Sequence, residues 1–556
     1  MNRNLMADTT LRLSCASIDK QTNYVETRTP NELEGGALRC GTPPVYTSYE
    51  VLAVLLQYGC VGLFYGCLPN LNYPVFTGYY HMTGAQSNSV KTLLGLGWTF
   101  KVFFGLLTDC VPLLGYRRKP WMIIGWLCCL VVLIVVVAMD FGKPYYSDLS
   151  LLGIPLNNMT ESQLQTINTD APDKGGVLAI LFGIATVFYV ITDSAADGLV
   201  IEYAQREPLA IRGRMQSLVY ATRTVFSSVS MALVGFCMNS PRFAGSFDWD
   251  FGLNTMYILL CIPCIIMPII AFVFINDTKQ PKSHFPTYIS QVWQLIQKRA
   301  TWQIMLFSFF YQLFASGGLA STAAPYVMME WAEVKNLNYQ VLSILSTWVL
   351  ATMMTLIGKY GTQWNWKVVV VTTILSVATI DAVVQFCTIF NVLRSQYFYL
   401  GAPLAEAFPN GIAFIVTTFL IAELAGIGNE GMMCGLFMTT FNLPQVVGPV
   451  IGNIIYSHFT VDAESLAQDS ESTRYQVAYT YIIYYGAMLL GCCTVVLLPS
   501  QKEELQQLQL TSKDHPYIAG CVCVFLVGMF VIAVLGSLLA MFPSTSCLRI
   551  AGGSGC

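Results

Sequence analysis

Charged side chains are scarce in this chain of 556 residues, where Asp, Glu, Lys and Arg together make up 11%. A soluble domain carries about 25% charged residues. Hydrophobic residues make up 54% of the chain, and the mean hydropathy is +0.56. Much of the surface must therefore face something other than water, which excludes a soluble enzyme, a disordered scaffold and a secreted domain framed by disulfides. The formal net charge of −3 is too small to indicate nucleic acid as a partner.

Catalytic and metal-binding motifs are missing as well. The four histidines lie in loops or near the ends of apolar runs, and they are His81, His284, His458 and His515. No His-Glu-x-x-His or Gly-x-Ser-x-Gly motif occurs. The cysteines lie in apolar stretches such as Cys128-Cys129, and no Cys-x-x-Cys pair has a histidine partner. We therefore predict no enzymatic activity, no metal site and no cofactor.

Long apolar runs are abundant. A helix needs about 20 mostly apolar residues to cross a hydrocarbon core of roughly 30 Å. Eight runs contain no charged residue: Val51–Leu68, Trp121–Met139, Leu253–Ile275, Trp302–Met329, Gln340–Gly358, Gly431–His458, Gln476–Gln501 and Tyr517–Leu548. Five more carry isolated charges: Ser89–Asp109, Gly176–Gly198, Met215–Met238, Lys367–Ile389 and Pro403–Ala425. The sequence therefore predicts thirteen membrane-spanning helices.

The spacing of these runs predicts the domain organisation. We expect a cytoplasmic segment (1–48), a six-helix bundle (49–275), a cytoplasmic linker (276–300), a second six-helix bundle (301–498), a polar linker (499–516), an extra transmembrane helix (517–541) and a tail (542–556). Two bundles joined by a linker are typical of secondary transporters. The predicted fold class is an all-α polytopic membrane protein with two six-helix bundles and one extra C-terminal transmembrane helix.

The distribution of Lys and Arg predicts the orientation. With the N-terminus in the cytoplasm, 19 of these 29 residues lie inside, eight lie outside and two fall within spans. This bias favours the cytoplasmic N-terminus. The sequon at Asn158 then lies in an outer loop and is a candidate glycosylation site. The tail also lies outside, where Cys547 and Cys556 either oxidise together or remain two thiols. We expect the plasma membrane, with an organelle membrane as the alternative.

Four charged residues lie within predicted spans of the first bundle, and they are Lys101, Asp193, Asp197 and Arg223. An ionisable residue at the centre of a span costs at least about 2.5–3.5 kcal/mol and indicates function by default. Asp193 and Asp197 share a helix face, and an ion pair between Asp193 and Arg223 is geometrically reasonable. These residues either lock the bundle together or face a central cavity, where carboxylates could titrate during transport.

The second bundle is less informative. Asp381 lies within one run and Glu423 near the inner end of the next. Four prolines predict helix breaks, which transporters use to expose backbone groups to a cavity; they are Pro325, Pro403, Pro409 and Pro444. Aromatic clusters such as Phe309-Phe310-Tyr311 either stack on a flat ring or serve packing alone.

Two predicted inner loops carry more specific patterns. The first reads Gly105-Leu-Leu-Thr-Asp109-Cys-Val-Pro-Leu-Leu-Gly115-Tyr116-Arg117-Arg118-Lys119-Pro120. The second reads Asp193-Ser-Ala-Ala-Asp197-Gly-Leu-Val-Ile-Glu202-Tyr-Ala-Gln-Arg206-Glu-Pro208, followed by Arg212-Gly213-Arg214-Met-Gln216-Ser217 and then Arg223. An aspartate that closes one helix beside a basic turn that opens the next can form a charge-assisted latch on the cytoplasmic face.

At these loops the sequence resembles the folate–biopterin transporter family of the major facilitator superfamily. That family carries an Asp-x-x-Ala-Asp-Ala-Leu-Val-Val-Glu-type run, then Arg-Gly-x-x-Gln-Ser and a later arginine. The matching residues of the second loop are Asp193, Ala196, Asp197, Leu199, Val200, Glu202, Arg212, Gly213, Gln216, Ser217 and Arg223. Those of the first loop are Gly105, Asp109, Gly115, Tyr116, Arg117, Arg118 and Pro120.

The resemblance covers roughly residues 49–501 and is dense in the first bundle. In the second bundle, Glu430-Gly431 and Asn442-Leu443 fit the start of the family's eleventh helix. Three features depart from the family. Gly198 stands where the family has alanine, residues 225–228 replace a glycine-rich run, and the thirteenth span lies outside the common core.

The resemblance implies proton-coupled transport of folates or pterins by alternating access. Protons, the small-molecule substrate and the lipid bilayer are then the partners. A pterin ring could stack on aromatic side chains and donate hydrogen bonds to Asp193 or Asp197, and folate carboxylates could pair with Lys101 or Arg223. The predicted cytoplasmic gate comprises Asp109, Arg117, Arg118, Glu202, Arg212, Arg214 and Glu430. The alternatives are a transporter of the same fold for another small solute, such as an anionic metabolite or an amino acid, and a receptor that binds solute without moving it.

Overall fold

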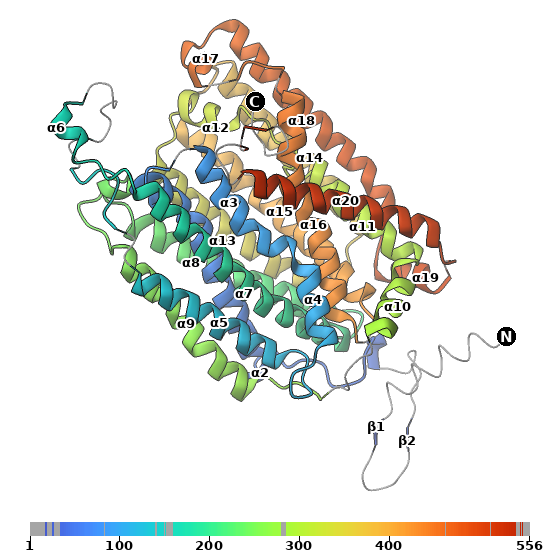
Figure 1. Cartoon of the computed structure of the whole chain (residues 1–556). Helices are drawn as coiled ribbons and strands as arrows, with labels where there is room; N and C mark the ends of the chain where they lie inside the picture. The colour runs from blue at the N-terminus through green and yellow to red at the C-terminus, as the bar shows by residue number, and fades with distance from the viewer. Residues whose placement is uncertain are drawn as a thin grey trace.

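The computed structural model describes residues 17–18, 25–26, 34–82, 84–139, 142–148, 151, 159–279, 285–426, 428–456, 458–461, 463–511, 513–540, 545 and 547–548. Eleven helices in this part of the chain are long and apolar enough to cross a membrane. A bent pair of helices supplies a twelfth crossing. Figure 1 shows these helices running side by side through the molecule.

The first half of the chain contains β1 (Ser17–Ile18), β2 (Val25–Glu26), η2 (Glu34–Gly36), α2 (Tyr49–Asn70), η3 (Asn72–Tyr79), α3 (Gly84–Thr99), α4 (Lys101–Cys110), α5 (Lys119–Ala138), α6 (Glu161–Leu164), α7 (Ala171–Arg206), α8 (Arg214–Cys237), η6 (Pro241–Phe243) and α9 (Leu253–Phe274). The second half contains α10 (Phe285–Ile296), α11 (Arg299–Phe314), α12 (Ala324–Tyr326), η7 (Val327–Trp331), α13 (Asn336–Tyr360), α14 (Trp366–Ile389), α15 (Gln396–Leu424), α16 (Glu430–Tyr456), α17 (Ala463–Gln468), α18 (Glu471–Thr494), η8 (Val495–Leu497), α19 (Lys502–Thr511) and α20 (Pro516–Ala540). The strands β1 and β2 form one short antiparallel pair.

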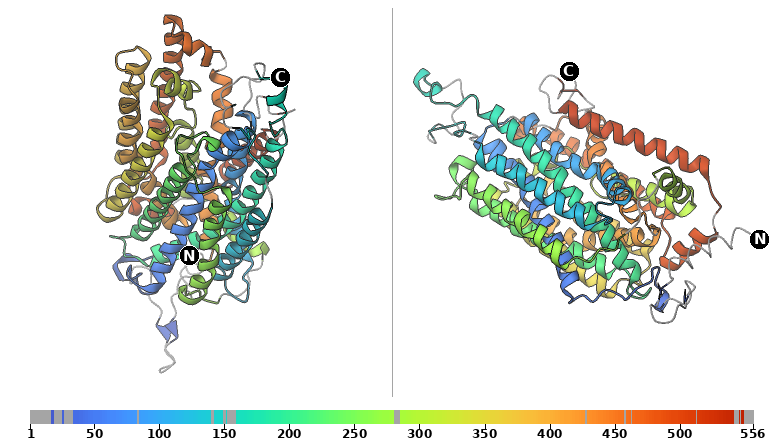
Figure 2. Two further views of the ribbon diagram at one scale, coloured as in Figure 1. Left: turned by 90° about the vertical axis from the view of Figure 1, so that its left-hand side faces the viewer. Right: turned by 60° about the horizontal axis from the view of Figure 1, so that its bottom comes forward.

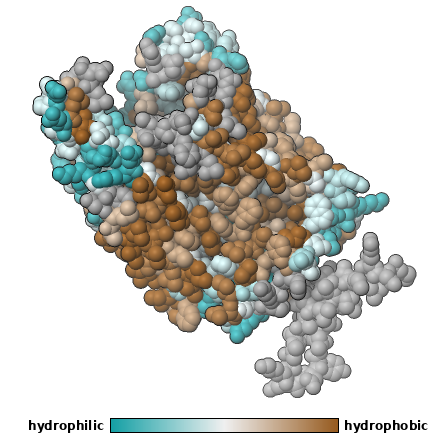
Figure 3. Space-filling view, in the orientation of Figure 1, coloured by the Kyte–Doolittle hydropathy of each residue, from teal (hydrophilic) through white to brown (hydrophobic). Residues whose placement is uncertain are grey.

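The predicted fold class is confirmed: the helices form two six-helix bundles, with α20 as the extra C-terminal helix. Of the thirteen predicted spans, twelve are long and apolar enough to cross a membrane in the described part of the chain, and the remaining one, α11, has only 16 residues. The first bundle runs from α2 to α9, with α3 and α4 forming one bent span. The second runs from α11 to α18. On the face shown in Figure 3, a broad apolar belt covers the body of the molecule, and polar residues gather toward its ends. This belt is the surface that a lipid bilayer covers.

The breaks in the helices differ from those predicted at prolines. Pro403 and Pro409 lie inside the continuous helix α15, and Pro444 lies inside α16. The prediction of a break at these three prolines is wrong, because backbone groups freed by proline in a membrane helix can find other partners. Pro325 lies in the short helix α12, after the break that ends α11. Since α11 has only 16 residues, the span predicted there is a helix followed by an irregular segment and a second short helical segment.

The linker between the bundles caps a helix of the first bundle. The carboxylate of Asp277 accepts hydrogen bonds from the backbone N–H groups of Arg118 (2.8 Å) and Lys119 (3.0 Å), where α5 begins. These N–H groups have no partner within the helix, and a carboxylate at this position also suits the helix dipole. The linker therefore holds the start of α5.

Close backbone packing joins the two halves between α4 and α16. A Cβ atom added to Gly105 of α4 would lie 2.1 Å from the carbonyl oxygen of Gly431 on α16. A Cβ atom on Gly435 would lie 2.5 Å from the carbonyl oxygen of Lys101. Small residues that let membrane helices approach closely are a common packing device. The contact lies near the end of the molecule that we call the basic end, after its four arginines Arg117, Arg118, Arg212 and Arg214.

The extra helix α20 contacts both halves. Its Phe530 ring packs edge-to-face against Phe100 and Phe103 of the first half, at centroid distances of 5.5 and 5.7 Å. Its Phe525 ring packs against Phe309 and Phe310 of the second half, at 5.0 and 6.0 Å. Figure 2 shows this helix lying along the outside of the bundle. It therefore bridges the seam between the two halves on one side.

We predict that Gly105→Ala loosens the contact between α4 and α16. The added methyl group must displace backbone atoms, so the closed basic end should be destabilised by about 1–3 kcal/mol. Labelling of the native Cys110, which is buried at the end of α4, by a maleimide added at the basic end should rise and is measured by peptide mass spectrometry. Gly95→Ala is the matched control, because a Cβ atom there meets no other atom within 4 Å. Equal labelling in both variants would contradict the prediction.

Candidate transport site and gate

A central cavity of about 560 Å³ lies between the two halves. Its lining comes from helices of both bundles: Tyr65, Arg223, Thr224, Ser227, Met231, Tyr311, Gln312, Ser316, Thr347, Leu350, Met354, Asn410, Phe414, Phe441, Asn442 and Gln445. Small-molecule sites typically have volumes of about 300–1,000 Å³ and combine apolar walls with a few polar groups. Among these lining residues, Arg223 carries the only formal charge.

Aromatic rings surround the guanidinium group of Arg223. Its Cζ atom lies 4.7 Å from the ring centre of Tyr220, 5.5 Å from Tyr65 and 5.7 Å from Trp98. These cation–π contacts hold the side chain and leave its N–H groups available. No ion pair of Arg223 occurs among the residues that the structure describes, so its guanidinium group can bind an anion directly in the cavity.

The other charged residues predicted for the site form a separate buried cluster. The ammonium group of Lys101 lies 2.6 Å from a carboxylate oxygen of Asp193 and 2.5 Å from one of Asp197. Tyr58 donates a hydrogen bond to the other oxygen of Asp197 at 2.5 Å. Each of the three charged side chains is at most 2% exposed. The expected pair of Asp193 with Arg223 is therefore replaced by a pair with Lys101, because α4 places this lysine directly against α7.

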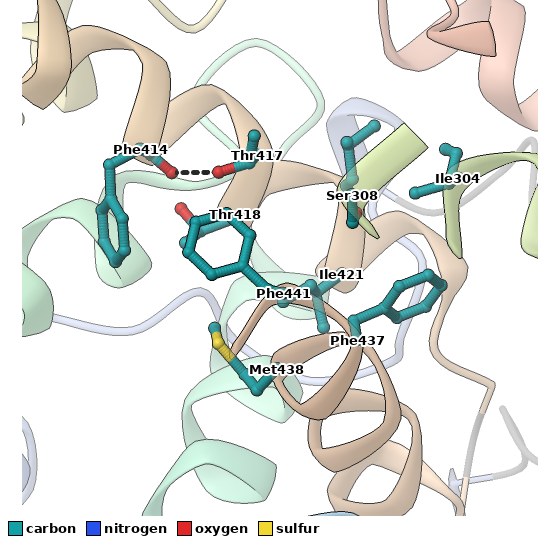
Figure 4. A pocket seen from close by; sticks show the side chains of 10 residues that line it. Ile304, Ser308, Phe414, Thr417, Thr418, Ile421, Phe437, Met438 and Phe441 are labelled. Carbon is teal, nitrogen blue, oxygen red and sulfur yellow. Dashed lines mark hydrogen bonds between the residues drawn. The ribbon is translucent and has the colours of Figure 1, made fainter. Parts of the chain in front are cut away.

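Phenylalanine side chains close the cavity toward the basic end. A residual pocket of about 20 Å³, enough for about one water molecule, lies between α11, α15 and α16. In Figure 4, Phe414 and Thr418 on α15 face Met438 and Phe441 on α16. Phe414 and Phe441 line both this pocket and the central cavity. The passage from the cavity toward the basic end is therefore sealed.

Arg118 is the centre of the first ion-pair group at the basic end. Its side chain is fully buried and lies 2.5 Å from Asp109, 3.2 Å from Glu430 of the second half and 3.5 Å from Glu202. Asp109 also accepts a hydrogen bond from the backbone N–H of Met432 at 2.7 Å, where α16 begins. One arginine and one aspartate thus join three helices of the first half to the second half.

Gly198 explains one departure from the family pattern. A Cβ atom at this position would lie 2.4 Å from Cζ of Arg118. The alanine that the family carries there could not coexist with this position of the guanidinium group. Glycine therefore lets Arg118 lie flat against α7.

The remaining predicted gate arginines also reach from the first half to the second. Arg117 donates to the carbonyl oxygen of Gly428 at 3.3 Å, and Arg214 donates to that of Lys359 at 3.4 Å. Arg212 donates to both carboxylate oxygens of Glu423, at 2.8 and 2.9 Å. Glu423 was noted in the sequence but not assigned to the gate. The structure thus brings all seven predicted gate residues to one interface.

Three further residues take part in this interface and were not predicted. Arg39 bridges Glu202 (3.3 Å) and Glu430 (2.6 Å) from the segment before α2. Tyr288 of the linker helix α10 donates to Asp109 at 2.8 Å. Lys502 of α19 donates to the carbonyl oxygen of Arg212 at 2.6 Å. The buried positions of α10, which are Tyr288, Val292 and Ile296, recur every four residues. This amphipathic spacing is the one sequence signal that could have predicted that α10 packs against the interface.

Glu207 lies beside this interface, just after α7 ends. Its carboxylate accepts hydrogen bonds from the backbone of Gly213 (2.7 Å) and Met215 (2.9 Å) and from Tyr46 (2.7 Å). Loss of solvent is the largest influence and raises the pKa of Glu207 from 4.5 to about 7. The hydrogen bonds and the nearby ammonium group of Lys502 oppose this rise. Burial likewise lowers the pKa of Lys502 from 10.5 to about 8.

Two predictions concern the opposite side of the membrane. The candidate glycosylation site Asn158 lies outside the described residues. Cys547 is disulfide-bonded, and Cys556 lies outside the described residues.

Comparison with known proteins points to one family. The model of the BT1 family matches residues 66–171. The folate-biopterin transporter of Synechocystis sp. (strain ATCC 27184 / PCC 6803 / Kazusa) is 24% identical over 429 residues, which cover 73% of this chain and 75% of that protein. The probable folate-biopterin transporter 6 of Arabidopsis thaliana is 33% identical over 94 residues, which cover 16% and 18%. The resemblance to the folate–biopterin transporters is confirmed.

The fold is similar to that of solved sugar transporters, one of which is described as a major facilitator superfamily protein. The proton:xylose symporter XylE, bound to 6-bromo-6-deoxy-D-glucose, aligns with a TM-score of 0.55 at 13% identity, over 84% of this chain and 99% of that one. A D-xylose-proton symporter aligns with a TM-score of 0.53 at 12% identity, over 82% and 99%. At such identity the likeness concerns the fold alone. Together with the sequence relatives, it identifies a multi-pass membrane transporter.

We predict that Asp109→Asn shifts the resting population toward a state open at the basic end. Removing one partner of a buried ion pair costs about 3–5 kcal/mol. This cost destabilises only the state in which the two halves meet at the basic end, because the contacts exist only in that state. Maleimide labelling of Cys110 from the basic end should increase by at least about tenfold. Labelling of Ser316→Cys, which lines the cavity, should decrease.

Asp250→Asn is the control for this experiment, because Asp250 pairs with Arg242 in a partly exposed loop of one half. It should leave the labelling at both positions unchanged. Unchanged accessibility on both faces in the Asp109→Asn variant would show that the ion pair does not hold the gate.

We predict that Glu207 makes stability fall as pH rises from about 5 to about 7. Because its pKa is raised from 4.5 to about 7, the folded state binds more protons than the unfolded state in this window. The stabilisation is complete below pH 4.5 and is lost as pH rises through 7, by roughly 1 kcal/mol per pH unit. Thermal unfolding midpoints across this range should therefore vary less in Glu207→Gln than in the unmodified protein. Parallel pH profiles for the two proteins would refute the assignment.

Proposed function

We propose that this protein is a secondary active transporter that moves folates or pterins by alternating access, coupled to protons. The observation that carries the proposal is Arg223, a cation without an ion-pair partner in a cavity that both halves line. A buried arginine without a direct ion-pair partner favours an anionic ligand, because the ligand can accept charge-assisted hydrogen bonds from its N–H groups. A folate carboxylate provides such a charge.

The rest of the cavity suits a flat heterocycle. The rings of Tyr311, Phe414 and Phe441 offer faces for stacking. Amide groups of Gln312, Asn410, Asn442 and Gln445 can both donate and accept hydrogen bonds. A pterin edge presents both kinds of partner. We therefore assign its recognition to these amides, since Asp193 and Asp197 are engaged by Lys101 behind the cavity wall.

The cluster of Lys101, Asp193 and Asp197 is the proposed coupling site. With Arg223 nearby, two positive and two negative charges balance within the first half. A bound substrate anion neutralises Arg223 and reduces the positive potential at the nearby Asp193, which favours protonation of this carboxylate. Substrate and proton then promote each other's binding, as symport requires.

The gate completes the proposed cycle. The ion pairs at the basic end hold the halves together there, and we assign this state as the one in which the cavity opens to the opposite side. Their separation would open the cavity toward the cytoplasm, if the charge bias sets the orientation as expected. The domain boundaries at residues 275 and 301, glycosylation at Asn158 and location in the plasma membrane are further parts of this proposal.

Uptake into proteoliposomes tests the function. Radiolabelled folate and biopterin should accumulate in vesicles that contain the protein, and an inward proton gradient should increase the accumulation. Empty vesicles and vesicles without a gradient are the controls. Binding without accumulation would favour a receptor. No uptake of either compound by folded protein would favour another anionic solute or an amino acid.

We predict that Arg223→Gln weakens folate binding by about a hundredfold, because a charge-assisted contact in a desolvated site is lost. Equilibrium binding to purified protein measures the change. Arg242→Gln is the control, because Arg242 is paired with Asp250 and does not line the central cavity. Asp193→Asn should retain exchange of substrate across the membrane but lose stimulation by the proton gradient. Unaltered affinity and transport in both variants would sink the site assignment.

A further inference from the structure

The span formed by α3 and α4 breaks beside the coupling site at Phe100, three residues after Gly97. Its two parts meet at an angle of 44° around Phe100. The N–H of Phe103 bonds to the carbonyl oxygen of Phe100 at 2.9 Å instead of continuing the regular ladder to Thr99. The carbonyl oxygen of Thr99 and the N–H of Val102 are thereby left without their helical partners. In a membrane such groups need other partners.

One hydroxyl group from the opposite half satisfies both groups. Oγ1 of Thr439, on α16, accepts a hydrogen bond from the N–H of Val102 at 3.1 Å and donates one to the carbonyl oxygen of Thr99 at 3.2 Å. The Thr439 side chain is 5% exposed, which leaves little room for water to replace it. An inserted side chain of this kind is a recognised cause of a sharp kink. Here the inserted group belongs to the other half.

The break also determines where Lys101 lies. Lys101 is the first residue of α4, between Phe100 and Val102, and its ammonium group contacts Asp193 and Asp197. Its carbonyl oxygen lies against Gly435, one helical turn before Thr439 on α16. One turn of α16 therefore contacts the backbone on both sides of this lysine.

We infer that Thr439 is a positioning residue for proton coupling, which holds the α3–α4 break and so places Lys101 between the two carboxylates. When the halves separate at the basic end, α16 carries the hydroxyl group away. Thr99 and Val102 then regain helical partners, the span straightens and Lys101 leaves Asp193 and Asp197. The carboxylates lose their cation in the state that exchanges protons with the cytoplasm. This inference rests on the proposed function.

The surroundings of the carboxylates are otherwise set by the first half. Arg223 and Lys101 supply the positive charge, and Tyr58 donates to Asp197. From the second half, Cys434 on α16 lies close to Asp197 and Lys101. Of the charged groups, Lys101 alone follows immediately after the break in the span. The loss of the Thr439 contact therefore affects the two carboxylates by displacing Lys101.

Substitution of Thr439 tests the inference in proteoliposomes. Thr439→Val removes the hydroxyl group and keeps the shape, so gradient-driven accumulation should fall by about tenfold while exchange of substrate stays within about twofold of the unmodified protein. Thr439→Ser should restore accumulation. Thr440→Val is the matched control: Thr440 is also buried on α16, but its hydroxyl group bonds only within its own helix, to Leu436. Equal losses in the two valine variants, or loss of exchange together with accumulation, would overturn the inference.

Infrared spectroscopy supplies a measurement that needs no substrate. The measured signal is the carbonyl stretch of neutral Asp193 and Asp197, which is assigned by its loss in Asp193→Asn and Asp197→Asn. At neutral pH this band should be at least about twice as strong in Thr439→Val as in Thr440→Val. The reason is that Lys101 no longer favours the charged form of the carboxylates in Thr439→Val. An unchanged band would overturn the inference even if transport falls. If the unmodified protein transports neither folate nor biopterin, the proposed function fails, while this comparison still decides the role of Thr439.

Discussion

A buried arginine needs negatively charged partners around its guanidinium group, and at the basic end Arg118 is such an arginine. Its guanidinium group is fully buried and contacts carboxylates from α4, α7 and α16. Removing it from water would cost several kcal/mol if these partners were absent. The start of α16 is held against the first half by this contact, and the glycine at position 198 leaves room for it. The ion pairs of the gate are thus the partners that the buried guanidinium group of Arg118 requires.

The two loops that carry the gate arginines act in similar ways. Each follows a helix that ends at the basic end, and each sends two arginines to the second half. In both, one arginine meets a carboxylate and the other meets a backbone carbonyl group. The coupling cluster lies on the same helices, nearer the middle of the membrane. The helices that meet at the basic end are therefore the ones that hold the proposed transport charges.

Much of this architecture was predictable because a bilayer constrains sequence strongly. Apolar runs of the required length located the spans, and isolated charges within them located the coupling cluster and Arg223. The partner of Asp193 was not predictable, because one sequence does not reveal which helix lies against α7. The break at Phe100 was also hidden, since its cause, Thr439, is more than 300 residues away. Conversely, Pro403, Pro409 and Pro444 suggested breaks that the surrounding helices prevent.

The position of α20 has a consequence for the membrane around the transporter. One of its phenylalanines is held by the first half and the other by the second. In the proposed alternating-access cycle, rigid halves could not rock while both of these contacts persist, so each cycle would exchange aromatic contacts for contacts with acyl chains. Lipid molecules at this seam then become participants in the conformational equilibrium. The thickness and fluidity of the bilayer therefore enter the turnover rate through one helix that touches neither the cavity nor the gate.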